Sequence, residues 1–420
     1  MKLKKKLRKW MRKLSKKSYR MKKLVDKTRE LDHIRYYKKE CMTQPTDEKL
    51  VLFECFFAKK YVDSPKAIYL EMLNNPKYND FRFVWVFRRE ELEKKQKLVD
   101  NDRTTVVSYN TQECWKMYGR AKYWVLNTRV QDFIQKKPDQ VFIETWHGTP
   151  LKRLGFDIKT GNNPKFTPEE LGKRYLNNVQ KANFWISPSR FATEAFTTAF
   201  GFDRLGMEEK LIETGYPRND DLFRVTPGKV AALKEEMNLP RDKKIILYAP
   251  TWRDNEHEIG VGFTFDPVAV TEKLIESLPE DYIILMRLHY LIANEIDLTK
   301  FTGKAYDYSG YEDINDLYAV ADVLMTDYSS VFFDYANLHR PMLFYMYDLE
   351  AYRNESHDFY FDLDVLPGPV LKTQEEVLNA IHHLPEIEEK YREKYEAFNK
   401  RFNYLDDENA SLRVIQRCIG

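Results

Sequence analysis

Residues 321–336, with the sequence ADVLMTDYSSVFFDYA, predict a buried β-strand that passes directly into a helix. The apolar strand ends at Thr326, and the polar residues that follow turn the chain. A helix then extends to about Leu338. A strand followed at once by a helix is the repeating unit of parallel sheets, so this stretch favours the α/β class.

The start of this helix carries side chains that suit a phosphate group. Ser329 and Ser330 place two hydroxyls beside the exposed amides of a helix N-terminus. Asp334, one turn into the helix, is expected to point back toward the same end, where it can accept a hydrogen bond from a ribose or a base. Serine is also a preferred N-cap, so a cap that serves only its own helix is the alternative.

The alternation of strands and helices extends through most of the chain. A turn at Gly215–Asp220 and a helix at about Lys229–Met237 separate two halves, and from Glu375 onward the pattern is helical. We expect two doubly wound Rossmann-like domains, residues 46–225 and 226–385, with a cleft between them, and a helical segment at 386–420. The expected strands are Val51–Phe57, Phe83–Phe87, Thr105–Ser108, Tyr123–Leu126, Val141–Thr145 and Phe184–Ile186, then Lys244–Ala249, Tyr282–Met286, Val323–Thr326 and Met342–Phe344.

A histidine lies where the strand at 141–145 stops. Gly148 and Pro150 prevent the strand from continuing, and ligands of open α/β sheets bind just beyond such strand ends. Because histidine exchanges protons near neutral pH, His147 is a candidate general base. Lys152 and Arg153, which follow it, suit an anionic substrate. A hydrogen-bonded loop histidine without a chemical role is the alternative.

Two strand ends of the second half add further polar groups. Strand 244–249 leads into Thr251, Trp252 and Arg253, which supply a hydroxyl, a stacking ring and a cation. Strand 282–286 leads into Arg287 and His289, which the alternation of side chains places on one side. An Arg287 that merely pairs with a carboxylate is the alternative. Two histidines facing the cleft and a phosphate-type helix start together predict group transfer from a phosphate-containing donor.

Charge is strongly segregated along the chain. Residues 1–23 hold 13 lysines and arginines and no acid, which leaves 55 basic and 65 acidic residues in the remainder. Within the tail, residues 1–45, apolar side chains recur at helical spacing, and such a basic amphipathic helix binds an anionic membrane surface. Nucleic-acid binding is not expected, because the folded body is acidic. A merely solvated tail is the alternative. The apolar positions are Leu3, Leu7, Trp10, Leu14, Met21 and Val25.

Composition limits the compartment and the class of protein. The 420 residues contain no run of eighteen apolar residues and no apolar core after the basic start, so neither a membrane span nor a secretory signal is predicted. The four cysteines, at 41, 55, 114 and 418, lack metal-like spacing and suit a reducing compartment. We expect a soluble or peripheral protein, with the basic tail at the cytoplasmic face of the membrane.

Four motifs, in order, resemble those of the CDP-glycerol glycerophosphotransferase family, the TagB, TagF and Tar-type enzymes that build wall teichoic acids in Gram-positive bacteria. They are WHGTPLK at 146–152, APTWR at 249–253, RLH at 287–289 and TDYSSV with DY at 326–335. Further matches are FYFD at 359–362 and LPGP at 366–369. The resemblance spans roughly residues 51–385. It implies a GT-B fold, in which the C-terminal domain holds most of the nucleotide.

The resemblance also implies roles for single residues. His147 would deprotonate an acceptor hydroxyl, which attacks the β-phosphorus of CDP-glycerol and releases CMP, while His289 would stabilise the leaving group. No cofactor or metal is expected, since the Asp-x-Asp at 362–364 lies in a late aromatic segment and fixed donors can stabilise the developing charge. The donor-binding set is then Thr251, Arg253, Arg287, Asp327, Ser329, Ser330 and Asp334.

Two departures from the family pattern bear on the acceptor and the donor polyol. Ala58-Lys59 stands where relatives often have Gly-Lys, and His357-Asp358 replaces an Arg-Gly pair. The basic tail fits an undecaprenyl-linked acceptor, and other teichoic acid enzymes or a second copy of the chain are further candidate partners. Two alternatives stay open: a GT-B glycosyltransferase that uses a nucleotide sugar, and a non-catalytic membrane-bound scaffold.

Overall fold

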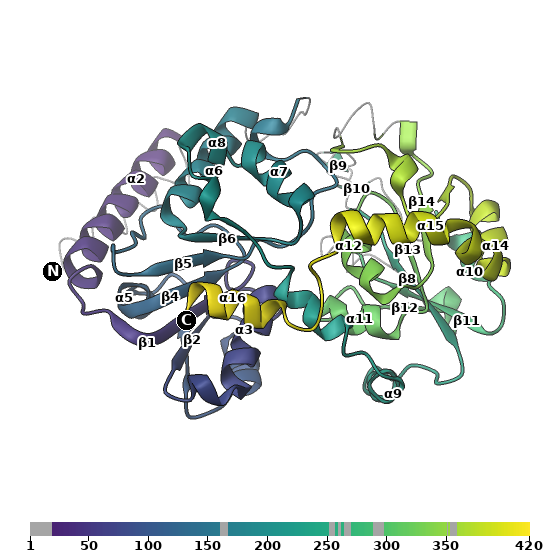
Figure 1. The fold of residues 1–420 in the computed structure, drawn as a ribbon, viewed down its shortest axis with the longest axis horizontal. Coiled ribbons are helices and arrows are strands. Elements are labelled where there is room, and N and C mark those ends of the chain that lie inside the picture. The colour runs from purple at the N-terminus through teal and green to yellow at the C-terminus, as the bar shows by residue number, and fades with distance from the viewer. Residues whose placement is uncertain are drawn as a thin grey trace.

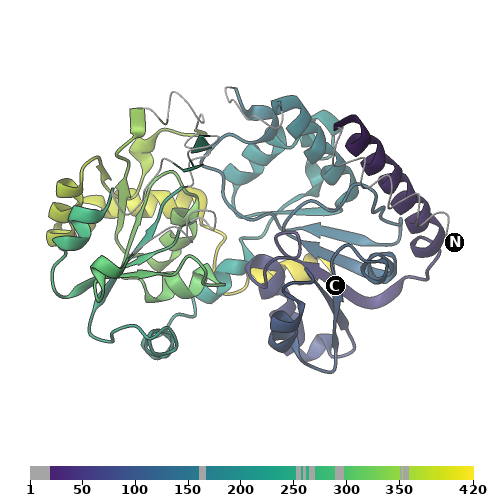
Figure 2. The same cartoon turned by 180° about the vertical axis from the view of Figure 1, so that it is seen from behind.

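The computed structural model describes residues 19–159, 167–251, 257–258, 262–263, 270–288, 298–350, 352 and 359–420. Within these residues the chain forms two parallel-sheet α/β domains that lie side by side (Figure 1, Figure 2). A 3-10 helix, η6 (Pro217–Leu222), leads from the first domain to the second. This is the predicted two-domain arrangement.

The N-terminal domain is built on a seven-stranded parallel sheet with the order β3-β2-β1-β4-β5-β6-β7. Its strands are β1 (Asp47–Glu54), β2 (Arg82–Phe87), β3 (Thr104–Ser108), β4 (Ala121–Leu126), β5 (Val141–Glu144), β6 (Phe184–Ser187) and β7 (Leu211–Glu213). The helices of this part are α3 (Asp63–Asn74), α4 (Leu92–Gln96), α5 (Gln112–Arg120), α6 (Pro168–Lys181), α7 (Arg190–Ala199) and α8 (Phe202–Leu205).

Apolar residues cover both faces of this sheet. Leu52 and Trp124 pack on one face, whereas their neighbours Phe53 and Val125 pack on the other, and all four are fully buried. Since successive strand residues point to opposite faces, continuous apolar runs are what a sheet covered by helices on both sides requires.

The C-terminal domain repeats the plan with a six-stranded parallel sheet, ordered β12-β11-β8-β13-β14-β15. Its strands are β8 (Lys244–Ala249), β11 (Tyr282–Met286), β12 (Ala305–Asp307), β13 (Val323–Thr326), β14 (Met342–Tyr345) and β15 (Val370–Leu371). The helices are α9 (Pro227–Glu236), α10 (Glu272–Glu276), α11 (Ile314–Val320), α12 (Val331–Tyr335), α14 (Gln374–His382) and α15 (Leu384–Phe402). Apolar clusters again lie on both faces of the sheet.

All ten predicted strands are present, but the sequence missed β7, β12, β15 and the antiparallel pair β9 (His257–Glu258) and β10 (Gly262–Phe263). These missed strands are two or three residues long, too short to show a periodicity. The extension of the first strand to Phe57 is wrong. Phe56, Phe57 and Ala58 have φ angles of 46°, 54° and 63°, so the chain turns away from the sheet after Glu54.

The C-terminal helical segment divides between the two domains. Phe398 and Phe402 of α15 pack into the core of the C-terminal domain. The chain then crosses back, and α16 (Ala410–Cys418) buries Val414 and Ile415 in the N-terminal domain beside α3 (Figure 1). The two domains are therefore connected twice, by η6 and by this crossing.

The N-terminal helix α2 (Tyr19–Tyr36) runs along the outside of the first domain and continues into a π-helical turn at Tyr37–Cys41 (Figure 1). Its end is packed: the His33 ring lies 4.7 Å from that of Trp115, and Tyr37 is fully buried. Most of the predicted membrane-contacting stretch, residues 1–18, lies outside the described residues. Among the residues that are described, no helix is both long enough and apolar enough to cross a bilayer.

Candidate functional site

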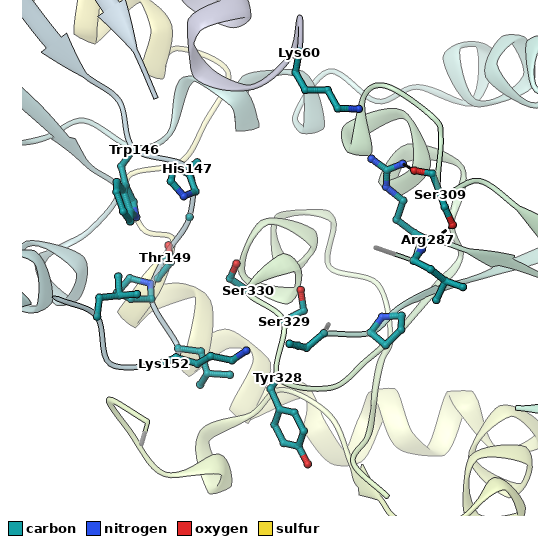
Figure 3. Close-up of a pocket in the computed structure, with 17 residues that line it drawn as sticks. Lys60, Trp146, His147, Thr149, Lys152, Arg287, Ser309, Tyr328, Ser329 and Ser330 are labelled. Carbon is teal, nitrogen blue, oxygen red and sulfur yellow. Dashed lines mark hydrogen bonds between the residues drawn. The ribbon is translucent and has the colours of Figure 1, made fainter. Parts of the chain in front are cut away.

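A cavity of about 520 Å³ lies between the carboxyl ends of the two sheets (Figure 3). Its lining comes from the N-terminal loops at Lys60 and at 146–154 and from the C-terminal loops at 250–251, 287–288, 309 and 328–330. In each sheet the strand order reverses at one place, between β1 and β4 and between β8 and β13. Ligands of open α/β sheets bind at such switch points, and here the two switch points face a common cavity.

The loop after β5 presents His147 to the cavity. Trp146 adopts a left-handed conformation with a φ of 52°, and its N–H donates to the Glu144 carboxylate at 3.2 Å. Glu144 is fully buried, where burial raises its pKa to about 8, and its other oxygen accepts a 2.6 Å hydrogen bond from Asn178. The Trp146 ring stacks on the imidazole of His147 with ring centres 4.2 Å apart. Glu144 and Trp146 thus fix the turn that carries the histidine.

The hydrogen bonding of His147 assigns its tautomer. Its Nδ1 lies 2.7 Å from the carbonyl oxygen of Asn127, the first residue after β4. A carbonyl oxygen only accepts, so Nδ1 carries the hydrogen and Nε2 of the neutral ring keeps its lone pair. Burial lowers the pKa of His147, which favours the neutral ring. These are the properties of a base at neutral pH.

The C-terminal switch point is built around Asp327. Its carboxylate accepts from the N–H of Thr251 at 2.7 Å and from the N–H of Tyr328, so it ties the end of β8 to the end of β13. Asp327 is itself buried and does not line the cavity, whereas Thr251 and Tyr328 do. The structure therefore places Asp327 behind the wall that the predicted donor-binding residues form.

Ser329 and Ser330 lie at the cavity wall where α12 begins (Figure 3). Ser330 occupies the N-cap position, but its side chain makes no capping hydrogen bond. The predicted helix to Leu338 is interrupted: α12 ends at Tyr335 and a 3-10 turn, η10 (Ala336–Leu338), follows. The His147 loop comes close to this point, because a methyl group at Gly148 would stand 3.3 Å from the Ser330 hydroxyl. Any larger residue at 148 would therefore be in tight contact with Ser330 of the other domain.

Asp334 does not line this cavity. Its carboxylate accepts three hydrogen bonds from the Arg218 guanidinium, at 2.8, 2.9 and 3.2 Å, and one from Asn219 at 3.1 Å. Arg218 also lies 3.5 Å from the Asp63 carboxylate at the start of α3. Burial raises the pKa of Asp334, and Arg218 opposes that shift. This carboxylate joins the domains, and Asp334 does not reach the cavity wall that holds the predicted donor-binding residues.

The cationic residues predicted after His147 lie on a contact between the domains. Lys152 lines the cavity and forms an isolated antiparallel bridge with Phe359, beside a 2.9 Å hydrogen bond from the Tyr360 N–H to the Leu151 carbonyl. Arg153 packs 5.2 Å from the centre of the Tyr360 ring and is not part of the cavity lining. Of these two cations, Lys152 is therefore the one placed to contact a ligand in this cavity.

Arg287 also lines the cavity, and its guanidinium donates to the carbonyl oxygen of Tyr308 at 2.9 Å and to that of Ser309. Its guanidinium hydrogen bonds therefore go to backbone carbonyls, whereas the sequence had left pairing with a carboxylate open. Lys60, opposite it on the loop after β1, was missed by the sequence reasoning (Figure 3). The sequence feature that could have drawn attention to it is the neighbouring Ala58-Lys59, which stands where relatives often have Gly-Lys.

Several predicted residues lie outside the described part of the chain. These are Trp252, Arg253 and His289, together with the His357-Asp358 departure. Asp362 and Asp364 are described; both are exposed and neither lines the cavity. Among the described residues there is no cluster of three or more histidine, cysteine or acidic side chains suited to a metal ion. All four cysteines are free thiols.

Comparisons with known proteins agree over nearly the whole chain. The model of a family described as CDP-Glycerol:Poly(glycerophosphate) glycerophosphotransferase matches residues 36–420. A teichoic acid poly(glycerol phosphate) polymerase of Bacillus spizizenii is 38% identical over 90% of this chain and 93% of its own length. A teichoic acid glycerol-phosphate transferase of Staphylococcus aureus is 35% identical over 92% and 97%. The chain spans about half, 48%, of a similar polymerase from Bacillus subtilis.

A solved structure gives the same picture. The wall teichoic acid polymerase TagF superposes with a TM-score of 0.83 at 35% identity, covering 96% of this chain and 97% of the TagF chain. A TagF variant with a histidine-to-asparagine replacement, soaked with CDPG, superposes with a TM-score of 0.82. The GT-B-like arrangement of two parallel-sheet domains, predicted from the sequence, is confirmed by this match.

Proposed function

The chain belongs to the CDP-glycerol:poly(glycerophosphate) glycerophosphotransferase family and is an enzyme, and we propose that it transfers glycerol phosphate from CDP-glycerol to a hydroxyl of a membrane lipid-linked teichoic acid acceptor. The observation that carries the proposal is the His147 tautomer. Its Nδ1 is held by the Asn127 carbonyl, so Nε2 is available as a base in a cavity bounded by both domains.

The proposed reaction is an in-line displacement at phosphorus. The acceptor oxygen attacks the β-phosphorus of CDP-glycerol, and its proton passes to Nε2 of His147. The bond between the β-phosphorus and the bridging oxygen breaks, and CMP leaves with the electron pair. The product is a new phosphodiester between acceptor and glycerol. Holding the two substrates in one cavity makes this attack effectively unimolecular.

The C-terminal wall supplies the groups that would receive the donor phosphates. Thr251, Ser329 and Ser330 offer hydroxyls, and Arg287 offers a fixed cation, so developing negative charge meets donors already in position. Arg253 and His289 are proposed for the same wall by the family motifs. Asp327 acts in this proposal by holding the Thr251 and Tyr328 backbone.

We further propose that turnover needs no metal ion, because cationic side chains line the cavity where phosphate charge develops. Turnover of purified enzyme in excess EDTA should therefore match turnover with added Mg²⁺. Loss of activity in EDTA that returns with Mg²⁺ would contradict this part of the proposal.

A donor screen tests the function directly. The enzyme is incubated with a synthetic lipid-linked acceptor and with CDP-glycerol, CDP-ribitol or a UDP-sugar, and products are sized by mass spectrometry. The expected result is growth by glycerol-phosphate mass units with CDP-glycerol. Growth only with a UDP-sugar would identify a glycosyltransferase instead. The number of units added separates a single transfer from polymerisation.

The basic N-terminal stretch supports a place at the cytoplasmic face of the membrane. We propose that residues 1–23 bind anionic lipid there, next to an undecaprenyl-linked acceptor, because a polybasic amphipathic segment and an acidic body would orient the enzyme toward the bilayer. Other teichoic acid enzymes or a second copy of the chain are further proposed partners.

A further inference from the structure

The cavity has a second cationic wall, away from Ser329 and Ser330. Lys60, on the loop after β1, belongs to the N-terminal domain, and Arg287, directly after β11, belongs to the C-terminal domain. Both line the cavity, and Figure 3 shows the Lys60 side chain extending toward the Arg287 side. Two cations from different domains therefore face the same space.

The carboxylate nearest to Lys60 is shared. Glu312 lies 3.8 Å from the Lys60 ammonium, and it also accepts hydrogen bonds from Lys95 and from the Tyr61 N–H at 2.9 Å. Lys95 is almost completely buried, so it holds this carboxylate firmly. The next acid, Asp313, is bound by Lys66 at 2.7 Å. Among the described residues, Lys60 therefore forms one long ion pair, with a carboxylate that it shares with Lys95.

The electrostatics of the two cations agree with this geometry. Burial lowers the pKa of Lys60, and Arg287 and Lys95 lower it further against the effect of Glu312. Burial likewise lowers the pKa of Arg287. A phosphate bound between these two partly buried cations would add the negative charge that their neighbourhood holds little of.

We propose that Lys60 and Arg287 together bind one phosphate group of a substrate, so that the N-terminal domain contributes a cation to phosphate binding across the cleft. This inference rests on the proposed function for its substrates. Two sources of the group share the same chemistry: the pyrophosphate of the CDP-linked donor, and the phosphodiester of a terminal glycerol-phosphate unit on a growing acceptor. The competing explanation is that Lys60 serves only to form an ion pair with Glu312.

Variants of the full chain separate these explanations. Lys60→Met removes the cation and Lys60→Arg restores it, while Lys97→Met removes an exposed lysine of the same domain that does not line the cavity. Glu312→Gln keeps an acceptor for the Tyr61 N–H but abolishes the ion pair. Thermal unfolding checks that each variant folds. Calorimetry measures binding of CDP-glycerol and of inorganic pyrophosphate, and steady-state kinetics measure KM for a glycerol-phosphate oligomer acceptor.

Loss of a charge-assisted hydrogen bond predicts that Lys60→Met weakens phosphate binding by about tenfold to a hundredfold, with Lys60→Arg close to wild type. Weaker CDP-glycerol binding assigns the site to the donor, and a raised acceptor KM alone assigns it to the acceptor. Glu312→Gln should keep or tighten binding. The proposal is overturned if Lys60→Met changes no binding constant, or if Glu312→Gln weakens binding as much as Lys60→Met does. Either result would show that Lys60 serves only to pair with Glu312.

The pyrophosphate measurement does not depend on the proposed reaction. If wild-type enzyme fails to use CDP-glycerol, yet Lys60→Met still weakens pyrophosphate binding, the proposed function fails and the anion site stands. If wild-type enzyme turns over CDP-glycerol and Lys60→Met matches Lys97→Met in every readout, the anion site fails and the function stands.

Discussion

Among single residues, His147 has contacts that leave one of its two ring nitrogens available for proton transfer. With Nδ1 held by Asn127 and the ring stacked on Trp146, only Nε2 is open for proton transfer. His147→Ala should lower kcat by about 10²–10⁴-fold, the usual contribution of a general base. CDP-glycerol binding, measured by calorimetry, should change little. His382→Ala, at an exposed histidine of α14, is the matched control and should keep wild-type turnover.

The same residue sets a pH dependence. A base works in its neutral form, and burial lowers the pKa of His147 below the ordinary value of about 6.5. Activity should therefore be lost only as pH falls through that lowered pKa, and it should not decline between pH 7 and about 6.5. The measurement is kcat against pH at saturating substrates. An acid limb centred above about 6.5 in the wild type would contradict this assignment.

Glu144, behind the histidine, makes stability depend on pH in the opposite direction. Its pKa is raised to about 8 in the fold, whereas in the unfolded chain it ionises near 4.3. Between these values the folded state binds the extra proton, so this group lowers the free energy of unfolding as pH rises, by up to about 1.4 kcal/mol per pH unit.

Glu144→Gln removes that contribution. Urea unfolding from pH 5 to 8 should show the variant gaining stability relative to wild type as pH rises. Glu93→Gln, at an exposed position, should run parallel to wild type. A Glu144→Gln curve that also stays parallel to wild type would show that this carboxyl is ionised in the fold.

The sequence predicts a site residue when the residues beside it in the chain mark its position. His147 was found because Gly148 and Pro150 end a strand within three residues of it. Lys60 was missed because its place in the site depends on its proximity to Arg287 and Glu312, which lie more than two hundred residues away on another domain. Asp334 was placed on the correct helix, but Arg218, from the connecting segment η6, binds it away from the cavity. No local pattern encodes that partner.

At the scale of elements, burial decided what the sequence could reveal. β8, β11 and β13 were predicted to the residue, because apolar runs covered on both faces have sharp polar ends. Edge strands such as β12 and β15 are two or three residues long and pair with only one neighbour, so no periodicity marks them. The end of β1 was misjudged because Phe56 and Phe57 continue the apolar run into a left-handed turn.

α12 is held by an ion pair that should matter for stability more than for donor affinity. Asp334→Ala leaves the buried Arg218 guanidinium with the Asp63 carboxylate at 3.5 Å and the face of the Tyr216 ring, but without its closest anion. Removing one partner of a buried pair costs about 3–5 kcal/mol, which urea unfolding would register. Asp362→Ala, at an exposed carboxylate, should be close to neutral. A raised KM for CDP-glycerol without lost stability would instead support the nucleoside contact expected from the sequence.

For the whole molecule, the two sheets place their switch points against one cavity, and the crossing from α15 to α16 keeps them there. Asp406 in this crossing accepts hydrogen bonds from the Tyr216 N–H, Asn219 and Asn337. The proposed base on one domain and the proposed phosphate-binding wall on the other are thus held by the same buried polar network that carries Arg218 and Asp334. The sequence predicted two domains and a cleft, but not the hydrogen-bonded network that connects the domains.

The basic segment should separate membrane binding from chemistry. Deleting residues 1–18 removes ten lysines and arginines, while leaving α2 from Tyr19 and its packing on Trp115 in place.

 

Because these charges and the apolar side chains at 3, 7, 10 and 14 are the proposed lipid contacts, the shortened enzyme should lose binding to anionic vesicles in a sedimentation assay. Turnover of a short soluble acceptor should stay near wild type, since the cavity is unchanged, while use of a lipid-linked acceptor in vesicles should fall. A chain in which the same ten residues are replaced by glutamine is the matched control for length. Unchanged vesicle binding in both variants would place membrane attachment, if the enzyme has it, on another surface.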